Sequence, residues 1–371
     1  MRQNTRWLNY SFGLIILIIS LVSIFNYKVD SSGIFGGSNY LSKAAKALTS
    51  GKMIAGLQNI DDRLFQQLII RNLQVQNDVI AIGSSTTMHL RKGAISKDRI
   101  NFFNHSVNGA SLEDYISIVG AYEEIHGYLP PAIILGIDPW VFNKNNGQGG
   151  RWKSLKKYYD FELDKIYIDR IKTNTNVGMN VIKWTQLINF DYTLSNIKFS
   201  IKSLLKKDSI NSPKFYIINT IETDDFIRVD DGSIYYPNEI KYKNNDQVKQ
   251  QAIAFAKATT PYSLGNFESL SNIELFEDFV KYLKVNNVDV ILFLPPYNPI
   301  AYDLLIDSGK YNHILIAEKY LIDFAKLNDI DLRGSYNPHR YNFANEDFFD
   351  AVHGRDRVTE EIFKSLLKKR Q

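Results

Sequence analysis

The stretch DVIAIGSS at residues 78–85 decides the fold of this chain. Four consecutive apolar residues, three of them β-branched, predict a short strand that is buried on both faces. A glycine and two serines then end the strand. Far downstream, DAVH at residues 350–353 places an Asp and a His three residues apart. A strand that ends at a serine, followed late in the chain by Asp-x-x-His, supplies the side chains needed for Ser-His-Asp chemistry.

Strand and helix patterns alternate on both sides of this stretch. Further apolar runs predict strands at residues 100–103, 132–137, 288–294 and 330–332. Helical spacing of apolar residues predicts helices at residues 64–73, 111–126, 273–285, 313–327 and 358–368. Such alternation produces a mostly parallel sheet with both faces covered and its ligand site beyond the carboxyl ends of the strands. Four candidate site residues follow predicted strands at that edge: Ser85, Gly109, Asp138 and Asn298.

The middle of the chain breaks this alternation. Residues 140–270 are rich in Asn, Lys, Tyr and Asp. Helices are expected there at residues 164–174 and 177–188, without matching strands. We interpret the segment as an insertion of about 120 residues within one domain. A separate second domain is the alternative.

Composition excludes several function classes. The formal net charge of +4 over 371 residues gives no sign of a nucleic-acid-binding protein. The chain has no cysteine, which excludes disulfides, thiolate metal sites, a cysteine nucleophile and lipoprotein-type lipid attachment. The six histidines show no metal-binding spacing, so no metal is assigned.

The N-terminus predicts a membrane anchor. Residues 7–27 are uncharged, and as a helix they span roughly 30 Å, the thickness of a bilayer core. Arg2 and Arg6 precede this segment, so residues 1–6 are expected in the cytoplasm and the rest outside it. A cleaved signal peptide is the alternative, but no small-x-small site follows directly. Residues 28–60, Gly/Ser-rich at their start, are expected to be a spacer before a domain at 61–371.

The late Asp-x-x-His suits the chemistry of an activated serine. A serine hydroxyl becomes a nucleophile when an imidazole takes its proton, and a carboxylate then orients the imidazole. Asp350 and His353 can present their side chains to one neighbourhood from a turn or a helix start. The order Ser, Asp, His is that of the α/β-hydrolases, but their Gly-x-Ser-x-Gly elbow is absent because Thr87 occupies its last position.

These motifs together resemble the SGNH (GDSL-type) hydrolase superfamily. The matching blocks are GSS at 83–85, NGAS at 108–111, LGID at 135–138 and DAVH at 350–353. The resemblance implies that Ser85 is the nucleophile, His353 the base and Asp350 its orienting partner. It also implies an oxyanion hole formed by the backbone amides of Ser85 and Gly109.

The resemblance covers residues 77–137 and 286–368 and leaves the middle unmatched. It implies an α/β fold: a three-layer α/β/α SGNH-hydrolase-like domain with a parallel sheet, a large insertion and one N-terminal transmembrane helix. No cofactor is implied.

Two residues depart from the family pattern. Ser84 replaces the family's aspartate, and Asp138 replaces the asparagine of the third block. An ionised carboxylate cannot donate a hydrogen bond and repels a developing oxyanion. Either Asp138 faces elsewhere, or a neighbour such as Asn108 or Asn298 supplies the donor. The loss of one oxyanion donor costs roughly 2.7–4 kcal/mol, so a slow enzyme is expected rather than an inactive one.

The single anchor, the GSS block and PPYNP at residues 295–299 narrow the resemblance. They are similar to the membrane-anchored envelope branch, which includes the alginate O-acetylation proteins and the teichoic-acid D-alanine transfer protein. Members of that branch act outside the cytoplasmic membrane beside a multi-span membrane acyltransferase. The resemblance thus implies an acyl-Ser85 intermediate and a polysaccharide substrate, with an acetyl group the expected cargo. Transfer and hydrolysis both stay open, because they differ only in the acceptor.

Other readings also stay open. The domain could be a non-catalytic scaffold that binds polysaccharide or an assembly partner, with Asp138 marking a degenerate site. A signalling ectodomain is a weaker option. Tyr235 and Tyr236 could stack on sugar rings, although core packing is the commoner role. His89, one turn past Ser85, is expected to be a surface or hydrogen-bonded histidine rather than a pocket residue.

Overall fold

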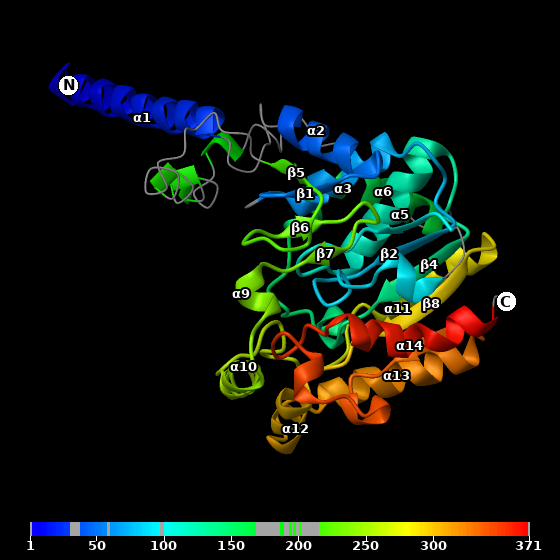
Figure 1. The fold of residues 1–371 in the computed structure, drawn as a ribbon. Coiled ribbons are helices and arrows are strands. Elements are labelled where there is room, and N and C mark those ends of the chain that lie inside the picture. The colour runs from blue at the N-terminus through cyan, green and yellow to red at the C-terminus, as the bar shows by residue number, and fades with distance from the viewer. Residues whose placement is uncertain are drawn as a thin grey trace.

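The computed structural model in Figure 1 describes most of the chain. The described residues are 2–29, 38–57, 60–96, 100–167, 186–188, 193–194, 196–197, 200–201 and 215–369. They form a mixed α/β protein with a parallel sheet and one N-terminal apolar helix. This confirms the α/β class and the parallel sheet expected from the sequence.

Five parallel strands form the main sheet. They are β2 (Val79–Ile82), β3 (Phe102–Asn104), β4 (Ala132–Gly136), β8 (Asp289–Leu294) and β9 (Asp331–Gly334). Their order is β3-β2-β4-β8-β9, with every neighbouring pair parallel. The five predicted strands are confirmed. The chain leaves β2 toward one edge and β4 toward the other, which makes the gap between these two strands the natural ligand crevice.

Both faces of this sheet are buried, because alternate strand residues enter two different cores. Ile80 and Ile82 belong to one core, while Val79 and Ala81 belong to the other. The first core is covered by α5 (Leu112–His126), α11 (Ile273–Val285) and α13 (His313–Leu327). The second is covered by α4 (Lys92–Ile95) and α14 (Asp356–Lys369). The continuous apolar run of β2 is explained by this double burial.

Local capping signals set the helix boundaries. The helix predicted at 64–73 is α3 (Asp62–Asn72), whose N-cap Asp61 accepts hydrogen bonds from Arg63 N and Leu64 N. Helix α5 begins with the predicted capping box of Ser111 and Asp114. The helices predicted at 273–285, 313–327 and 358–368 are also confirmed, as α11, α13 and α14.

A second sheet, antiparallel, joins the N-terminal region to the middle of the chain. Its strands are β1 (Met53–Ala55), β5 (Tyr216–Ile218), β6 (Ile227–Arg228) and β7 (Ile234–Tyr235), in the order β5-β1-β6-β7. Strand β1 pairs with β5 on one side and with β6 on the other. The sequence predicted neither this sheet nor its pairing.

The expectation of a spacer at residues 28–60 is corrected from Ser38 onward. Helix α2 (Ser38–Thr49) precedes β1, and its residues Leu41, Ala44 and Leu48 are fully buried. These apolar residues recur at helical spacing, and they pack with Phe65 and Ile69 of α3. The spacer was predicted from the Gly/Ser-rich start of the segment, and the amphipathic pattern that follows it was not recognised. The folded domain therefore begins before residue 61.

The remaining elements are helices of 3 to 13 residues. They are α6 (Lys156–Ile166), α9 (Asn238–Lys241), α10 (Asn245–Lys257), α12 (Pro299–Asp307), η1 (Pro139–Phe142), η2 (Arg151–Leu155), η3 (Gln186–Ile188), η4 (Pro338–Tyr341) and η5 (Asn345–Asp347). Most of the helices predicted at 164–174 and 177–188 lies outside the described residues.

Helix α1 (Arg2–Val29) projects away from the rest of the protein in Figure 1. Its stretch Tyr10–Val29 has a mean hydropathy of 2.1, and 6% of it is buried. By length and composition the helix can span a membrane or serve as a signal anchor. Near its end, Asn26 is buried and donates hydrogen bonds to Leu187 O (2.8 Å) and Thr193 Oγ1 (2.7 Å).

Candidate active site

Ser85 lies on a tight turn directly after β2, at the carboxyl edge of the main sheet. Within the turn, Thr87 N donates to Ser84 O (3.0 Å) and Met88 N donates to Ser85 O (3.3 Å). The turn packs against the end of the neighbouring strand β4. A Cβ atom added to Gly136 would lie 2.8 Å from Thr87 Cγ2, a distance that carbon atoms do not tolerate. The glycine therefore allows the serine turn to rest on β4.

His353 reaches the same edge from the C-terminal part of the chain. A bridge between Phe348 and Gly354 closes the loop that carries it. Within the loop, Asp350 Oδ1 accepts hydrogen bonds from Val352 N and His353 N, both at 2.9 Å. The loop thus fixes the backbone of Asp350 relative to that of His353.

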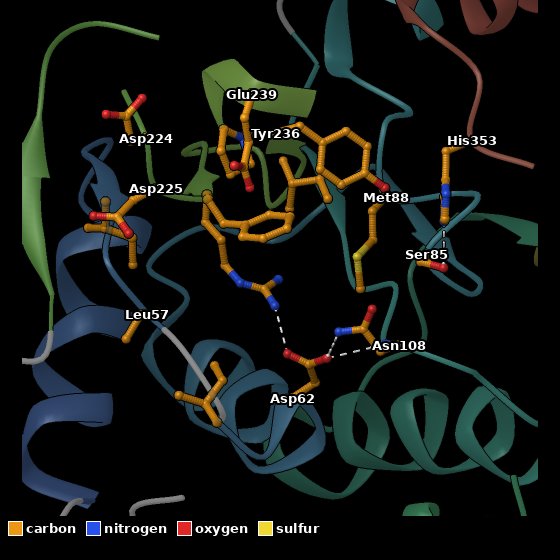
Figure 2. Close-up of a pocket in the computed structure, with 16 residues that line it drawn as sticks. Leu57, Asp62, Ser85, Met88, Asn108, Asp224, Asp225, Tyr236, Glu239 and His353 are labelled. Atoms are coloured by element: carbon orange, nitrogen blue, oxygen red, sulfur yellow. Dashed lines mark hydrogen bonds and ion pairs between the residues drawn. The ribbon is translucent and has the colours of Figure 1, made fainter. Parts of the chain in front are cut away.

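The three predicted catalytic residues come together in one hydrogen-bonded row. His353 Nδ1 lies 2.8 Å from Asp350 Oδ2, and His353 Nε2 lies 2.9 Å from Ser85 Oγ. Figure 2 shows His353 and Ser85 facing each other at one side of a cavity. Since both ring nitrogens face an oxygen, the neutral ring can donate from Nδ1 to the carboxylate and accept at Nε2 from the serine hydroxyl.

The charges of this row reinforce one another. Burial by itself lowers the pKa of His353, but the Asp350 charge and hydrogen bond raise it above its ordinary value of 6.5. Burial by itself raises the pKa of Asp350, but the attraction of His353 lowers it below its ordinary value of 3.8. Asp350 is therefore ionised at neutral pH, and it stabilises the imidazolium that would form when His353 takes a proton.

Ser85 and His353 open onto a cavity of about 720 Å³. Its apolar lining comes from the second sheet and its flanking segments and from the serine turn: Ile54, Leu57, Ile60, Met88, Phe226, Ile234, Tyr236 and Pro237. Asp224, Asp225 and Glu239 lie across the cavity from Ser85 (Figure 2). A volume of this size can hold a small organic ligand, and Ser85 lies within its wall.

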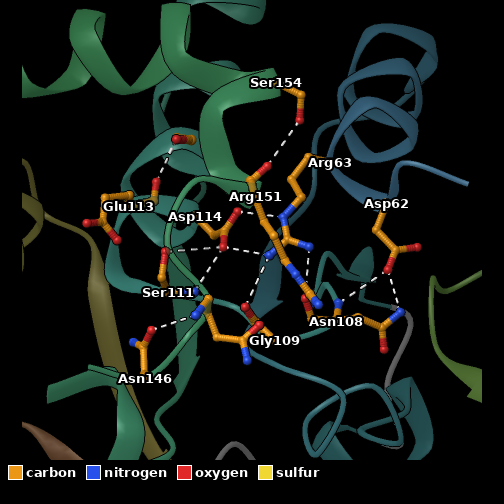
Figure 3. A network of polar contacts seen from close by, with 12 residues as sticks. Asp62, Arg63, Asn108, Gly109, Ser111, Glu113, Asp114, Asn146, Arg151 and Ser154 are labelled. Atoms are coloured by element: carbon orange, nitrogen blue, oxygen red, sulfur yellow. Dashed lines mark hydrogen bonds and ion pairs between the residues drawn. The ribbon is translucent and has the colours of Figure 1, made fainter. Parts of the chain in front are cut away.

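The loop that follows β3 is clamped by a buried arginine that the sequence did not single out (Figure 3). Arg63 Nη1 donates to Asn108 O (2.8 Å), and Arg63 Nη2 donates to Gly109 O (3.2 Å). The same guanidinium binds both carboxylate oxygens of Asp114, at 2.9 and 2.8 Å. Arg63 was missed because a lone arginine in a helical pattern gives no signal of its distant partners.

Asn108 lines the cavity, but its amide groups already have a partner. Asn108 Nδ2 donates to Asp62 Oδ2 (2.5 Å), and its backbone N donates to the same oxygen (3.3 Å). Arg228 Nη2 of β6 donates to the other oxygen of Asp62 (2.7 Å). Gly109 follows at φ +56°, a left-handed conformation that favours glycine. Gly109 itself is not among the residues that line the cavity.

Asp138 does not line the cavity either. It is 3% exposed and lies behind the serine turn, where Thr86 Oγ1 donates to its Oδ1 atom (3.0 Å). Burial raises the pKa of this carboxyl to about 7. Of the two alternatives that the sequence left open for Asp138, the structure favours a side chain directed away from the cavity.

Asn298 is a helix cap rather than a cavity residue, which corrects its prediction as a site residue. Its Oδ1 atom accepts from Ile300 N (3.0 Å) at the start of α12. Its Nδ2 atom donates to Asn345 Oδ1 (2.8 Å), and Asn298 is not among the residues that line the cavity. Its backbone N donates to Ala351 O (2.9 Å) and so supports the loop of Asp350 and His353.

His89 contradicts the expectation of a surface or hydrogen-bonded histidine. It is 1% exposed, and neither ring nitrogen has a hydrogen-bond partner. Its ring packs against Tyr236 (4.6 Å between centroids) and Phe349 (5.2 Å), and burial holds its pKa well below 6.5. Tyr236 in turn lines the cavity and lies 5.8 Å from the His353 ring. His89 therefore acts as a neutral packing residue beneath the site.

Comparison with known proteins assigns no family to this site. No protein-family model matches the chain, and no curated protein matches it. Within the described ranges, no group of three or more His, Asp or Glu side chains is arranged to hold a metal ion.

Proposed function

We propose that this protein is a serine-dependent enzyme of the SGNH type that transfers or removes an O-acyl group. The acyl group that we expect is acetyl. The polysaccharide that carries or receives this group would belong to the cell envelope or be exported. The row Asp350–His353–Ser85, with contacts of 2.8 and 2.9 Å, is the observation that carries the proposal. The position of Ser85 at the carboxyl edge of a parallel sheet adds support.

The proposed reaction begins with attack of Ser85 Oγ on the acyl carbonyl carbon while His353 Nε2 takes the hydroxyl proton. The backbone amide of Ser85 is the proposed donor to the oxyanion; the Gly109 amide is the second proposed donor, although Gly109 is not among the residues that line the cavity. When the tetrahedral intermediate collapses, the bond to the leaving alcohol oxygen breaks, and His353 returns its proton to that oxygen. An acyl-Ser85 ester remains.

The second half of the proposed reaction reverses these steps. His353 takes a proton from an acceptor hydroxyl, whose oxygen attacks the acyl-Ser85 carbonyl. Ser85 leaves with the proton that His353 returns. A glycan hydroxyl as the acceptor gives transfer, and water gives hydrolysis. Asp350 holds the tautomer of His353 in both halves.

The proposed setting is the outer side of the cytoplasmic membrane, with α1 as an uncleaved single-pass anchor. Two hydrogen bonds from Asn26 to Leu187 O and Thr193 Oγ1 support an α1 that stays with the folded chain. In this proposal the main sheet and its helices form a three-layer α/β/α domain, and residues 140–270 are its insertion. A multi-span membrane acyltransferase is the proposed partner that supplies the acyl group.

The test uses the full chain in detergent micelles and a fluorophosphonate probe, followed by intact-mass analysis. We expect one probe adduct in the wild type and none in Ser85→Ala. Ser50→Ala, which changes an exposed turn serine, is the matched control and is expected to label fully. Unchanged labelling of Ser85→Ala would exclude Ser85 as the nucleophile. No labelling of the wild type would favour the non-catalytic scaffold.

Acetyl-ester turnover separates the two outcomes of the acyl-enzyme. The labelled acetyl group is followed with and without a soluble polysaccharide acceptor. If the enzyme transfers the group, addition of the polysaccharide should place labelled acetyl on it and reduce the amount of free acetate. Hydrolysis predicts free acetate at the same rate in both samples.

A further inference from the structure

A buried polar chain runs behind Ser85. Ser84 Oγ lies 3.1 Å from Thr86 Oγ1, and Thr86 Oγ1 donates to Asp138 Oδ1 (3.0 Å). Ser84 is 0% exposed, Thr86 6% and Asp138 3%. These contacts join the residues on either side of Ser85 to Asp138, which lies two residues past the end of the neighbouring strand β4.

The surroundings of Asp138 contain aromatic hydroxyls but no basic partner among the ion pairs of the described residues. Tyr115 OH donates to Gly136 O (2.7 Å) and Tyr336 OH donates to Ile137 O (2.9 Å), so both hydroxyl protons are committed elsewhere. Among the described residues no hydrogen-bond partner reaches the Oδ2 atom of Asp138, while the Ser84 and Thr86 hydroxyls both lower the pKa of this carboxyl. The cation whose charge acts on this carboxyl is His353.

We propose that Asp138 is a positioning residue for the proposed serine nucleophile, because its carboxyl accepts the Thr86 hydrogen bond that holds the Ser84–Thr86 turn and its charge acts on His353. This inference rests on the proposed function. The Thr86 hydroxyl donates to Asp138, and this hydrogen bond holds the backbone at the residue that follows Ser85. Asp138 is thus no substitute for the family's oxyanion donor. Asp138 acts on the serine turn through Thr86, and it acts on His353 through its own charge.

Several titratable groups face this pair. Around Asp138 lie the hydroxyls of Tyr115, Tyr297 and Tyr336, whose pKa values are raised by burial and by the Asp138 charge. The charges that act on His353 come from Asp350 and Asp138, which raise its pKa, and from Lys243, which lowers it.

His89 also lies near the pair, and burial keeps it neutral. The Asp138 charge raises the pKa of His353, and the His353 charge lowers the pKa of Asp138, so the two groups influence each other's titration.

The substitution Asp138→Asn separates charge from hydrogen bonding, since the amide oxygen can still accept from Thr86. Loss of the negative charge lowers the pKa of His353, so its ring should titrate at lower pH than in the wild type. The acid limb of fluorophosphonate labelling should move in the same direction. Thr86→Val keeps the carboxyl but removes its hydrogen bond from Thr86, which raises the pKa of Asp138 further. It should slow labelling roughly tenfold, the effect of losing about 1.4 kcal/mol, and move the His353 midpoint less far than Asp138→Asn does.

Ring titrations are measured by NMR on the full chain in detergent, with isotope-labelled histidine. The chain has six histidines, and His353→Gln identifies the signal of interest. This readout needs no turnover. A wild type that does not label would overturn the proposed function, while the NMR midpoints would still report the coupling of Asp138 to His353.

An unchanged His353 midpoint in Asp138→Asn, in a chain that labels normally, would overturn this inference alone. If Asp138→Asn fails to fold by thermal unfolding, the pair Thr86→Ser and Thr86→Val decides the positioning role. The serine keeps the hydroxyl and should label at the wild-type rate. Equal rates in the serine and valine variants would contradict the proposal.

Discussion

The Nε2 atom of His353 lies 2.9 Å from the Oγ atom of Ser85, although the two residues are 268 positions apart in the chain. Each partner is held by its own local structure. The turn after β2 fixes Ser85, and the loop closed by Phe348 and Gly354 fixes His353. Since neither side chain has to move to make the contact, the pair is already arranged for proton transfer.

The first prediction concerns Asp350→Asn. Loss of the carboxylate removes the group that orients His353 and stabilises its charged form, so the labelling rate should fall roughly a thousandfold to ten-thousandfold. The acid limb of the reaction lies above pH 6.5 in the wild type, because His353 must be neutral to act as a base and its pKa is raised. Without the Asp350 charge that pKa falls, and the limb should move to lower pH.

A second Asp–His pair provides the matched control for this change. His339 Nε2 lies 2.8 Å from Asp303 Oδ1 on the surface, with both side chains about half exposed. Asp303→Asn should leave the labelling rate and its pH profile unchanged. An Asp350→Asn variant that labels as fast as Asp303→Asn would contradict the assigned role of Asp350.

The second prediction concerns the clamp on the loop that follows β3. Arg63→Met removes the donors to Asn108 O and Gly109 O and leaves Asp114 as a buried charge without its partner. The expected loss in the free energy of unfolding is about 3–5 kcal/mol, as for other broken buried ion pairs. Lys319→Met breaks an exposed pair with Asp323 and should cost under about 1 kcal/mol. Chemical denaturation of both variants measures the difference.

The third prediction concerns the contact between the serine turn and β4. In Gly136→Ala the new methyl group would collide with the Thr87 side chain, which belongs to the turn of Ser85. Overpacking of this kind costs about 1–3 kcal/mol and should also slow labelling of Ser85. Gly93→Ala is the control, because a methyl group there meets no atom within 4 Å.

The double variant Gly136→Ala with Thr87→Ala tests whether the collision is the cause. Removal of the Thr87 hydroxyl and methyl groups takes away the two closest contacts and leaves Thr87 Cβ at 2.9 Å, so the double variant should recover part of the stability lost by Gly136→Ala. Additive losses in the free energy of unfolding would show that the two positions do not interact.

The fourth prediction concerns the pH dependence of stability. Glu162 is fully buried. Its pKa is raised from 4.5 to about 9, mainly by burial and in second place by the charge of Glu123. Between these values the unfolded chain loses this proton while the folded chain keeps it, so stability falls as the pH rises. Glu162→Gln should unfold near the wild-type temperature at pH 5 and at a higher temperature at pH 8. Parallel thermal curves at both pH values would contradict the prediction.

Sequence patterns identified most of the main sheet because the signals there are local. A buried strand such as β2 needs a continuous apolar run, and the capping box of Ser111 and Asp114 marks the start of α5 without reference to other segments. The second sheet was not predicted, because β6 and β7 are two residues long and depend on pairing with β1 and with each other. Short strands of this kind have no periodicity that can be read from sequence.

The sequence by itself determined the five parallel strands, the apolar N-terminal helix and the identity of Ser85, Asp350 and His353 as candidates. Tertiary structure alone decided which polar residues share a neighbourhood. It placed Arg63 against Asn108 O and turned Asp138 toward Thr86, and it made Asn298 a helix cap. The physical reason is that apolar periodicity reflects burial of each segment, whereas a hydrogen bond or an ion pair depends on two segments whose distance in space the sequence does not state.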